Sequence, residues 1–175
     1  GLTYLAGMPD GPPVTPGSTS LADYISGLYG AVGILLALRE VELSGGGQVI
    51  DVALFESIFR VLDELAPLFA KHGIVRTPEG TGTRHACPHG HFVCADGKWV
   101  AIACTADRIW VRMANNVLGK PELALSHPTT ATRLADRDTI EGAVEVFTKS
   151  HTTSEVVAMC TEGDVPCGAI NSIED

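Results

Sequence analysis

One carboxylate, Asp23, stands at the start of a strongly apolar segment and could do chemistry there. Ser20 precedes it by three residues, and a serine followed three residues later by an acid is a helix N-terminus in which both side chains cap the backbone. The dipole and the free N–H groups of such a helix start favour an ionised carboxylate. An ionised carboxylate in this place fits either of two roles, a helix cap or the nucleophile of covalent catalysis.

A second group of reactive side chains lies between His85 and Cys94, where histidines and cysteines crowd into one segment. Zinc sites usually take their ligands in pairs from two chain segments, spaced as Cys-x2–4-Cys or His-x3–5-His. The spacing here is irregular and no second cluster follows, so we expect a loop that contacts a ligand and holds no metal. A non-catalytic binding or metal-holding module built on this stretch is the alternative from another functional class.

The composition is that of a soluble globular protein, with 45% apolar and 19% charged residues in a chain of 175. A net charge of −9 argues against nucleic acid or an anionic membrane as a partner, because both need a basic surface. Five cysteines without a dense framework indicate reduced thiols and a cytoplasmic protein. Cys167 follows Pro166 with no adjacent base, which favours a small buried residue over a nucleophile.

The longest apolar run, from Ala31 to Leu38, is far too short to span a membrane. No membrane partner is therefore expected. The chain begins at Gly1 without a methionine and stops at 173–175, where the pattern indicates the start of a new element, so we expect a piece of a longer protein.

Two helices are expected in the first part of the chain, and Asp23 lies in the first turn of the first one. Apolar residues recur at helical spacing from Leu21 to about Leu43 and from Ala53 to about His72, where Pro67 should kink the second helix or end it early. Residues 1–18 are predicted to be loop, and 48–52 a short strand or extended entry. Three glycines at every third position of the first helix indicate a neighbour packed close to its backbone: Gly27, Gly30 and Gly33.

The segment 73–90 is rich in Gly, Pro, Thr and His and is expected to be an exposed connection between two domains. The β-rich runs 91–94 and 98–104 flank an Asp-Gly turn, which predicts a hairpin. Helices are then expected at 106–118, 121–125, 136–149 and 153–163, with 165–170 extended and a helix starting at 172. The predicted organisation is one domain over 1–73, a linker or active-site loop over 74–90, and a second domain over 91–175.

Several segments occur in a fixed order that matches a known pattern. They are Gly7–Pro13, Asp23-x-x-x-Gly27, Gly33–Leu38, Ser44–Leu54, the hairpin Phe92–Ile102, and Gly163–Gly168. Together they resemble the class III CoA-transferase family, which includes formyl-CoA transferase, carnitine CoA-transferase and the α-methylacyl-CoA racemases. The resemblance covers nearly the whole chain.

The resemblance implies an α/β fold. Residues 1–73 would be the helical portion of a Rossmann-like large domain, and 91–175 a smaller α+β domain with a β-hairpin and helices. It also implies a homodimer of two interlocked, ring-like subunits, and it places much of the CoA site before Gly1. The piece alone is therefore expected to be inactive. Because the helix from Leu21 to Leu43 is apolar nearly all round, the piece is also expected to associate or aggregate.

The resemblance further implies that Asp23 is the catalytic nucleophile in a transfer of CoA from an acyl-CoA to a small carboxylic acid. The intermediates would be a mixed anhydride and an aspartyl-CoA thioester. The CoA thioester is then a substrate, and no permanently bound cofactor and no metal are expected. Where some family members have a glycine-rich active-site loop, this chain keeps one glycine, so its loop closure and acyl specificity are expected to differ. The expected substrate-binding residues are Arg84, His85, Pro88, His89 and Gly90.

An acyl-CoA racemase of the same family is the alternative within the resemblance, with Asp23 as acid or base beside a histidine upstream of this chain. Racemases of the family tend to have glycines directly after the aspartate. Here Tyr24, Ile25 and Ser26 follow it, which favours transfer.

Overall fold

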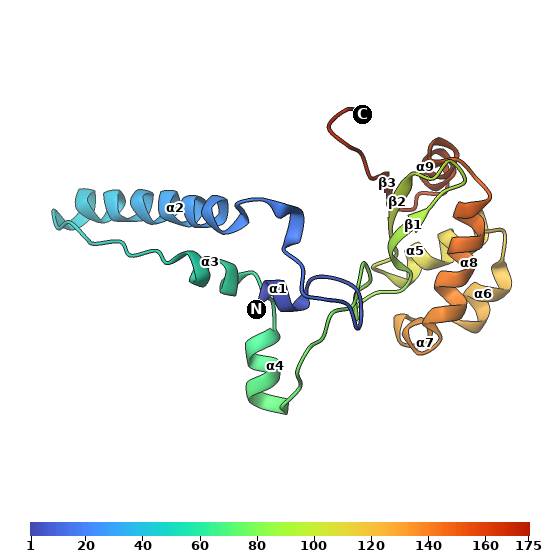
Figure 1. Cartoon of the computed structure of the whole chain (residues 1–175), viewed down its shortest axis with the longest axis horizontal. Coiled ribbons are helices and arrows are strands. Elements are labelled where there is room, and N and C mark those ends of the chain that lie inside the picture. Colours follow the sequence, from blue (N-terminus) through green and yellow to red (C-terminus); the bar gives the residue numbers. More distant parts are fainter. The chain divides into compact units, whose positions relative to one another are not determined.

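The computed structural model describes residues 1–175, apart from the side chain of Ser18. The chain forms two compact units, Gly1–Gly80 and Thr81–Asp175 (Figure 1). The division lies inside the segment for which the sequence predicts a connection. Each unit has its own elements.

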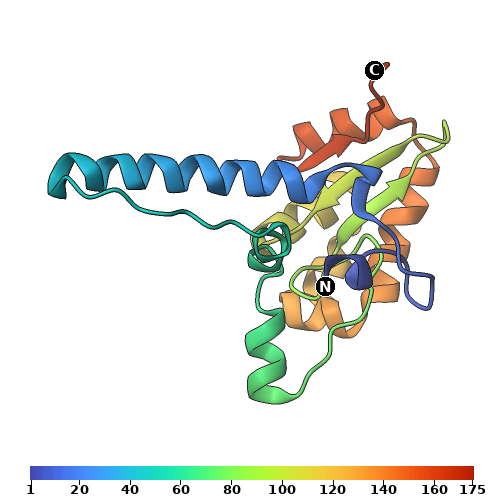
Figure 2. The ribbon, with the colours of Figure 1, turned by 60° about the vertical axis from the view of Figure 1, so that its left-hand side comes forward.

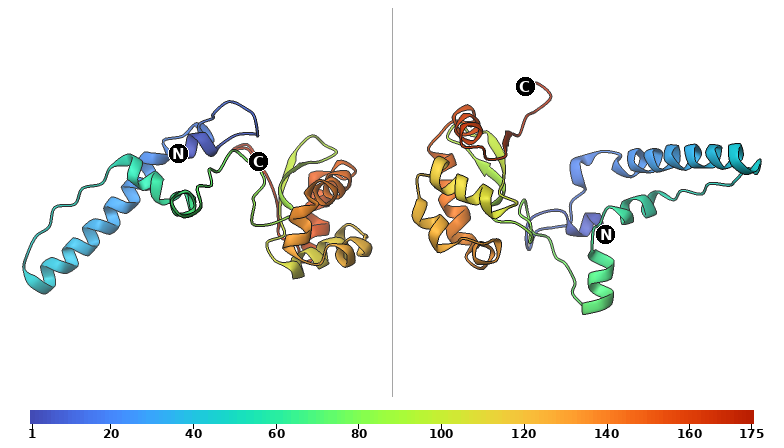
Figure 3. Two further views of the ribbon diagram at one scale, coloured as in Figure 1. Left: turned by 90° about the horizontal axis from the view of Figure 1, so that it is seen from below. Right: turned by 180° about the vertical axis from the view of Figure 1, so that it is seen from behind.

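All regular elements of the first unit are helices, joined by irregular segments. Its elements are α1 (Leu2–Leu5), the 3-10 helix η1 (Pro16–Ser18), α2 (Leu21–Ser44), α3 (Leu54–Arg60) and α4 (Leu65–His72). The prediction of a long helix after residue 20 is confirmed (Figure 3). Helix α2 ends at Gly45, whose φ of 76° is left-handed and whose N–H donates to the Val41 carbonyl.

Helix α2 leaves its apolar side chains exposed within this unit. Its one buried residue is Ser26, whereas Leu28, Leu35 and Leu36 are each about two-thirds exposed or more. By length and composition α2 could also cross a membrane, with a mean hydropathy of 1.6. The core helix of a soluble protein passes the same test, so the absence of a membrane partner stays a prediction.

The second predicted helix is in fact two. The break lies at 61–64, where Asp63 has a φ of 52°, and Pro67 lies in the first turn of α4, where its missing N–H costs no helical hydrogen bond. Residues 48–52 are described but form no strand. Among the described residues, Gly33 has the close neighbour expected for the α2 glycines, since a Cβ added there would lie 3.1 Å from Ile50 Cγ2, whereas Gly27 and Gly30 have no such neighbour within 4 Å.

The second unit is a three-stranded antiparallel sheet packed with helices (Figure 2). The strands β1 (His89–Val93), β2 (Trp99–Ala103) and β3 (Cys167–Ala169) lie in the order β1-β2-β3. The register pairs His91 with Ala101, and Ala101 with Gly168. The helices are α5 (Asp107–Arg112), the π-helix η2 (Met113–Val117), α6 (Pro121–Ser126), α7 (Thr130–Ala135), α8 (Arg137–Lys149) and α9 (Thr153–Glu162).

The core of this unit forms where the sheet meets its helices. Val100 and Ile102 alternate with more exposed residues along β2, so their side chains share one face. They join a cluster of fully buried apolar side chains that includes Trp110, Ile140 and Val156. The antiparallel pairing of β1 with β2 confirms the predicted hairpin.

Two expectations for this unit are wrong, and one helix is missing from the predicted set. The stretch Ala86–Pro88 is buried and β1 begins at His89, so the second half of the predicted connection is folded protein. Helix α7 was not predicted; a capping box between Thr129 and Thr132 starts it. No helix begins at 172.

Candidate active site

Asp23 is the third residue of α2, and its side chain lines a hollow of about 190 Å³. The other walls come from α1, from the η1 segment and from Ile58 of α3. Asp23 is the only charged side chain among the described residues that line this hollow. A carboxylate thus faces a space the size of a small group.

The helix cap expected from Ser20 and Asp23 is not formed. Ser20 is the N-cap residue, but its side chain makes no capping hydrogen bond, and its ψ of 54° lies outside the extended range usual for a cap. Within the described part of the chain, Asp23 has no hydrogen-bond or ion-pair partner. The carboxylate is therefore not engaged in holding the helix start.

Backbone donors lie beside the carboxylate. The first helical hydrogen bond of α2 runs from Tyr24 N–H to the Ser20 carbonyl at 3.1 Å, so the N–H groups of Leu21, Ala22 and Asp23 have no acceptor among the described residues. All three residues line the hollow. Such donors can stabilise an oxyanion that forms when a carbonyl is attacked.

The five residues predicted to contact substrate lie together in the second unit, whereas Asp23 lies in the first. Arg84 and His85 form the turn between the bridged residues Thr83 and Ala86. Their substrate contacts stay a prediction.

The remaining three predicted residues have structural roles in the second unit. Pro88 is fully buried, and its carbonyl accepts from Cys104 N–H at 2.9 Å. His89 and Gly90 belong to β1. A Cβ added to Gly90 would lie 3.1 Å from Thr81 Oγ1, so the chain approaches closely there. Substrate contact by these residues also stays a prediction.

A buried arginine that the sequence analysis did not single out fixes this segment. Arg133 of α7 is fully buried, and its Nε donates to the Cys87 carbonyl at 2.5 Å. Its Nη2 donates to Asp107 Oδ1 and to Thr130 Oγ1, each at 2.9 Å. The hydrogen bond from Arg133 holds the pKa of Asp107 below its usual value. No sequence motif marks this residue, because two of its partners, Cys87 and Asp107, lie far from it in the sequence.

The thiols of the second unit are free. Burial raises the pKa of Cys87 to about 11 and that of Cys104 to about 12. The hydrogen bond between Cys160 and Cys167 raises the pKa of Cys160 and lowers that of the half-buried Cys167. Among the described residues, no group of three or more His, Cys, Asp or Glu is arranged to hold a metal.

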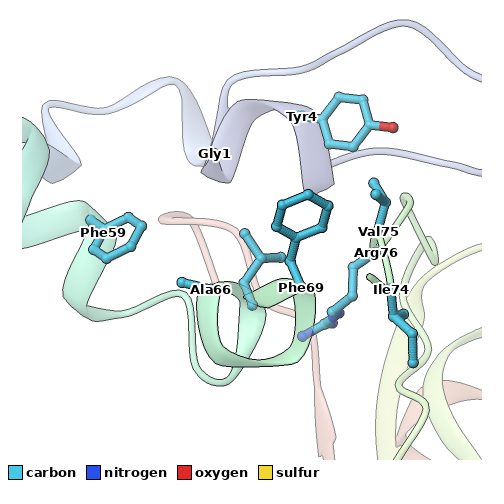
Figure 4. A pocket seen from close by; sticks show the side chains of 9 residues that line it. Gly1, Tyr4, Phe59, Ala66, Phe69, Ile74, Val75 and Arg76 are labelled. Carbon is cyan, nitrogen blue, oxygen red and sulfur yellow. The ribbon is translucent and has the colours of Figure 1, made fainter. Parts of the chain in front are cut away.

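A larger hollow of about 380 Å³ lies elsewhere in the first unit (Figure 4). Its walls are mostly apolar and include Tyr4, Phe59 and Phe69. Its charged lining residue, Arg76, donates from Nη1 to Glu64 at 3.2 Å. This hollow has space for an apolar group but holds no nucleophile.

The model of CoA-transferase family III matches residues 1–175. The chain belongs to this family. The beta subunit of succinyl-CoA–L-malate CoA-transferase from Chloroflexus aurantiacus is 48% identical over 178 residues, which cover 100% of this chain and 44% of that protein. Succinyl-CoA:mesaconate CoA-transferase from Haloarcula marismortui is 29% identical and covers 100% of this chain and 43% of its own length.

Solved structures agree with the family assignment. A CAIB/BAIF family protein from Brucella suis has a TM-score of 0.77 and 30% identity, over 99% of this chain and 46% of that chain. A hypothetical protein from Mycobacterium tuberculosis, at 21% identity, a TM-score of 0.78 and coverage of 99% and 46%, shows the shared fold. The predicted family and α/β fold class are thus confirmed. The chain spans less than half the length of these relatives.

Proposed function

We propose that the protein containing this chain transfers CoA from an acyl-CoA donor to a small carboxylic acid, with Asp23 as the covalent nucleophile. The observation that carries the proposal is the 48% identity, over the whole chain, to relatives named succinyl-CoA–L-malate CoA-transferase. These names support succinyl-CoA as donor and a four-carbon hydroxydicarboxylic acid as acceptor. The unpartnered carboxylate of Asp23 beside a small hollow supports the nucleophile.

The proposed chemistry proceeds in two halves. An oxygen of the Asp23 carboxylate attacks the thioester carbonyl of the donor, and CoA leaves as thiolate, which gives a mixed anhydride. The thiolate then attacks the Asp23 carbonyl, releases the donor acid and forms the aspartyl-CoA thioester. In the second half the acceptor carboxylate attacks this thioester and CoA leaves. The returning thiolate attacks the acceptor carbonyl and frees Asp23.

Oxyanions form at each attack, and the first-turn N–H groups of α2 supply donors close to the carboxylate. Racemisation would instead need an acid/base partner for Asp23. That partner is expected upstream of this chain, so the preference for transfer rests on Tyr24, Ile25 and Ser26, which follow Asp23.

The first prediction concerns Asp23 itself. Asp23→Asn in the intact protein should lower transfer from succinyl-CoA at least about 10³-fold, because the amide cannot form the anhydride. Hydroxylamine added with donor acyl-CoA should leave a hydroxamate on Asp23 of the wild type, detected by peptide mass.

Asp51→Asn is the matched control, since Asp51 is another exposed acid of the same unit that does not line the hollow. It should keep its activity. Wild-type transfer rates in Asp23→Asn, or a hydroxamate on another residue, would remove Asp23 from the mechanism.

We also propose a cytoplasmic homodimer with interlocked subunits, as the family resemblance implies. The free cysteines support the compartment, and the exposed apolar side chains of α2 are consistent with burial in an assembly. Two relatives are named as alpha and beta subunits, so a mixed oligomer is the alternative to test by solution mass.

A further inference from the structure

Cys160 has three other thiols around it in the second unit. It lies in the last turn of α9, and α9 packs against β3 (Figure 1). Cys94 directly follows β1, Cys104 directly follows β2, and Cys167 begins β3. All three lie near enough to raise the pKa of Cys160. The fold therefore brings thiols from the ends of the three strands to one buried thiol of a helix.

Cys160 and Cys167 are in direct contact, because their side chains form a hydrogen bond. The chain turns back directly after Cys160, whose carbonyl accepts from Val165 N–H at 2.8 Å. Two residues later Cys167 pairs with Ile102 of β2. A tight turn on one side and a strand pairing on the other thus hold the two sulfur atoms together.

The other two thiols are less suited to react with Cys160. The Cys94 side chain has a hydrogen-bond partner in Thr153, and Cys104 is fully buried, which raises its pKa to about 12. Cys167 is only half-buried, and the hydrogen bond from Cys160 lowers its pKa. Peroxides react with the thiolate form of a cysteine that they can reach. Cys167 meets both conditions, and Cys160 lies in contact with it.

We propose that Cys160 and Cys167 form a reversible oxidation site, which hydrogen peroxide converts to a disulfide. In the first step the Cys167 thiolate attacks one peroxide oxygen, the O–O bond breaks and hydroxide leaves, so the sulfur is oxidised to sulfenic acid while the peroxide is reduced. In the second step the Cys160 sulfur attacks the Cys167 sulfur. The S–O bond breaks, and the hydroxyl group leaves as water with the Cys160 proton. A dithiol reductant returns both thiols by exchange.

The disulfide would join the last turn of α9 to β3. It closes a ring over residues 160–167, and such a ring restricts the unfolded chain. Pro166, inside the ring, accepts from Ala103 N–H of β2 at 3.2 Å, so the ring is attached to the sheet as well. Oxidation should therefore move the unfolding of the second unit to a higher urea concentration.

The test treats the intact protein with hydrogen peroxide, blocks the remaining thiols with iodoacetamide after denaturation, and digests with a protease that cuts after glutamate. Glu162 lies between the two cysteines, so a disulfide keeps the two cleaved peptides joined. We expect the joined peptides from the wild type, lower in mass by two hydrogen atoms than the two separate peptides. Dithiothreitol should separate them.

Variants resolve the two steps. Cys160→Ser should stop after the first step, so dimedone, which reacts with sulfenic acids, should label Cys167. Cys167→Ser should give neither the disulfide nor dimedone label on Cys160. Cys104→Ser is the matched control, since it removes another thiol beside Cys160 and should still give the joined peptides. The wild-type digest needs no variant, so a variant that fails to fold leaves the test intact.

Three results would each overturn the assignment. They are separate peptides from the peroxide-treated wild type, a disulfide between Cys167 and Cys94 in place of Cys160, and a disulfide that forms only after unfolding in urea. Transfer of CoA is not measured in any of these experiments. Failure of the oxidation site therefore leaves the proposed function standing.

Discussion

At the scale of single residues, Cys167 differs from the other four thiols in the direction of its pKa shift, which is downward. The hydrogen bond from Cys160 lowers its pKa, whereas burial raises the pKa of Cys87 to about 11 and of Cys104 to about 12. Because the thiolate is the reactive form, iodoacetamide at pH 8 should label Cys167 first. Cys87 and Cys104 should react only after unfolding. Peptide mass mapping over time measures the order.

Cys160→Ala removes the hydrogen bond to Cys167 and should slow its labelling, since the pKa of Cys167 then rises. Labelling of Cys87 as fast as Cys167 would contradict this account.

The sequence located Asp23 but could not assign its role from local pattern alone. Ser20 and Asp23 have the spacing of a capping box, and the structure leaves that box unformed because the backbone at Ser20 departs from cap geometry. A backbone angle set by surrounding loops is not readable from two residue types. The family resemblance implies a nucleophilic role for Asp23, and this role stays a prediction.

At the scale of elements, Arg133 ties α7 to α5 and to the segment before β1. Asp107→Asn removes one charge from this contact and should destabilise the second unit by about 1 kcal/mol at pH 7, given that Asp107 is half exposed. Fluorescence of Trp110, which lies against Arg133, can follow unfolding in urea.

The pH dependence of the stability that Asp107 contributes follows from the direction in which its pKa is shifted. The folded pKa of Asp107 is lowered, so its contribution to stability is present above the unfolded value of about 3.9 and is lost as pH falls through the folded value. The difference between wild type and Asp107→Asn should therefore shrink below about pH 4. Asp138→Asn, at an exposed first-turn acid of α8, is the control. A difference that grows on acidification would refute the ion pair as the cause.

Elements with strong local periodicity were predictable. The apolar spacing from residue 21 and the Asp-Gly turn after Cys94 led to α2 and to the hairpin. The division between α3 and α4 was not predictable, because the apolar pattern runs through it and Pro67 suggests another place. Helix α7 starts at a local capping box, but its second member is Thr132 and not the usual Glu or Gln, so the sequence pattern does not mark it. The burial of Arg133 depends on partners far apart in the sequence, so no local signal announces it.

At the scale of the whole molecule, the two units differ in how much apolar surface they bury. Every buried apolar side chain of the described residues except Leu62 belongs to the second unit. Residues 81–175 alone should therefore unfold cooperatively in urea, whereas 1–80 alone should associate or stay unfolded. Light scattering and circular dichroism of the two pieces measure this. A monomeric, cooperatively folded 1–80 would show that its exposed apolar side chains need no cover.

The uncapped start of α2 has a consequence for how tightly any ligand binds. A helix turn without its capping hydrogen bond opens more often, so a ligand that contacts this turn must also order it. Part of the binding free energy is then used for that ordering, and the measured affinity is weaker than the contacts alone would give. Two acids that order the same turn lose the same amount. Selectivity between them is preserved while both remain easy to release, as repeated turnover requires.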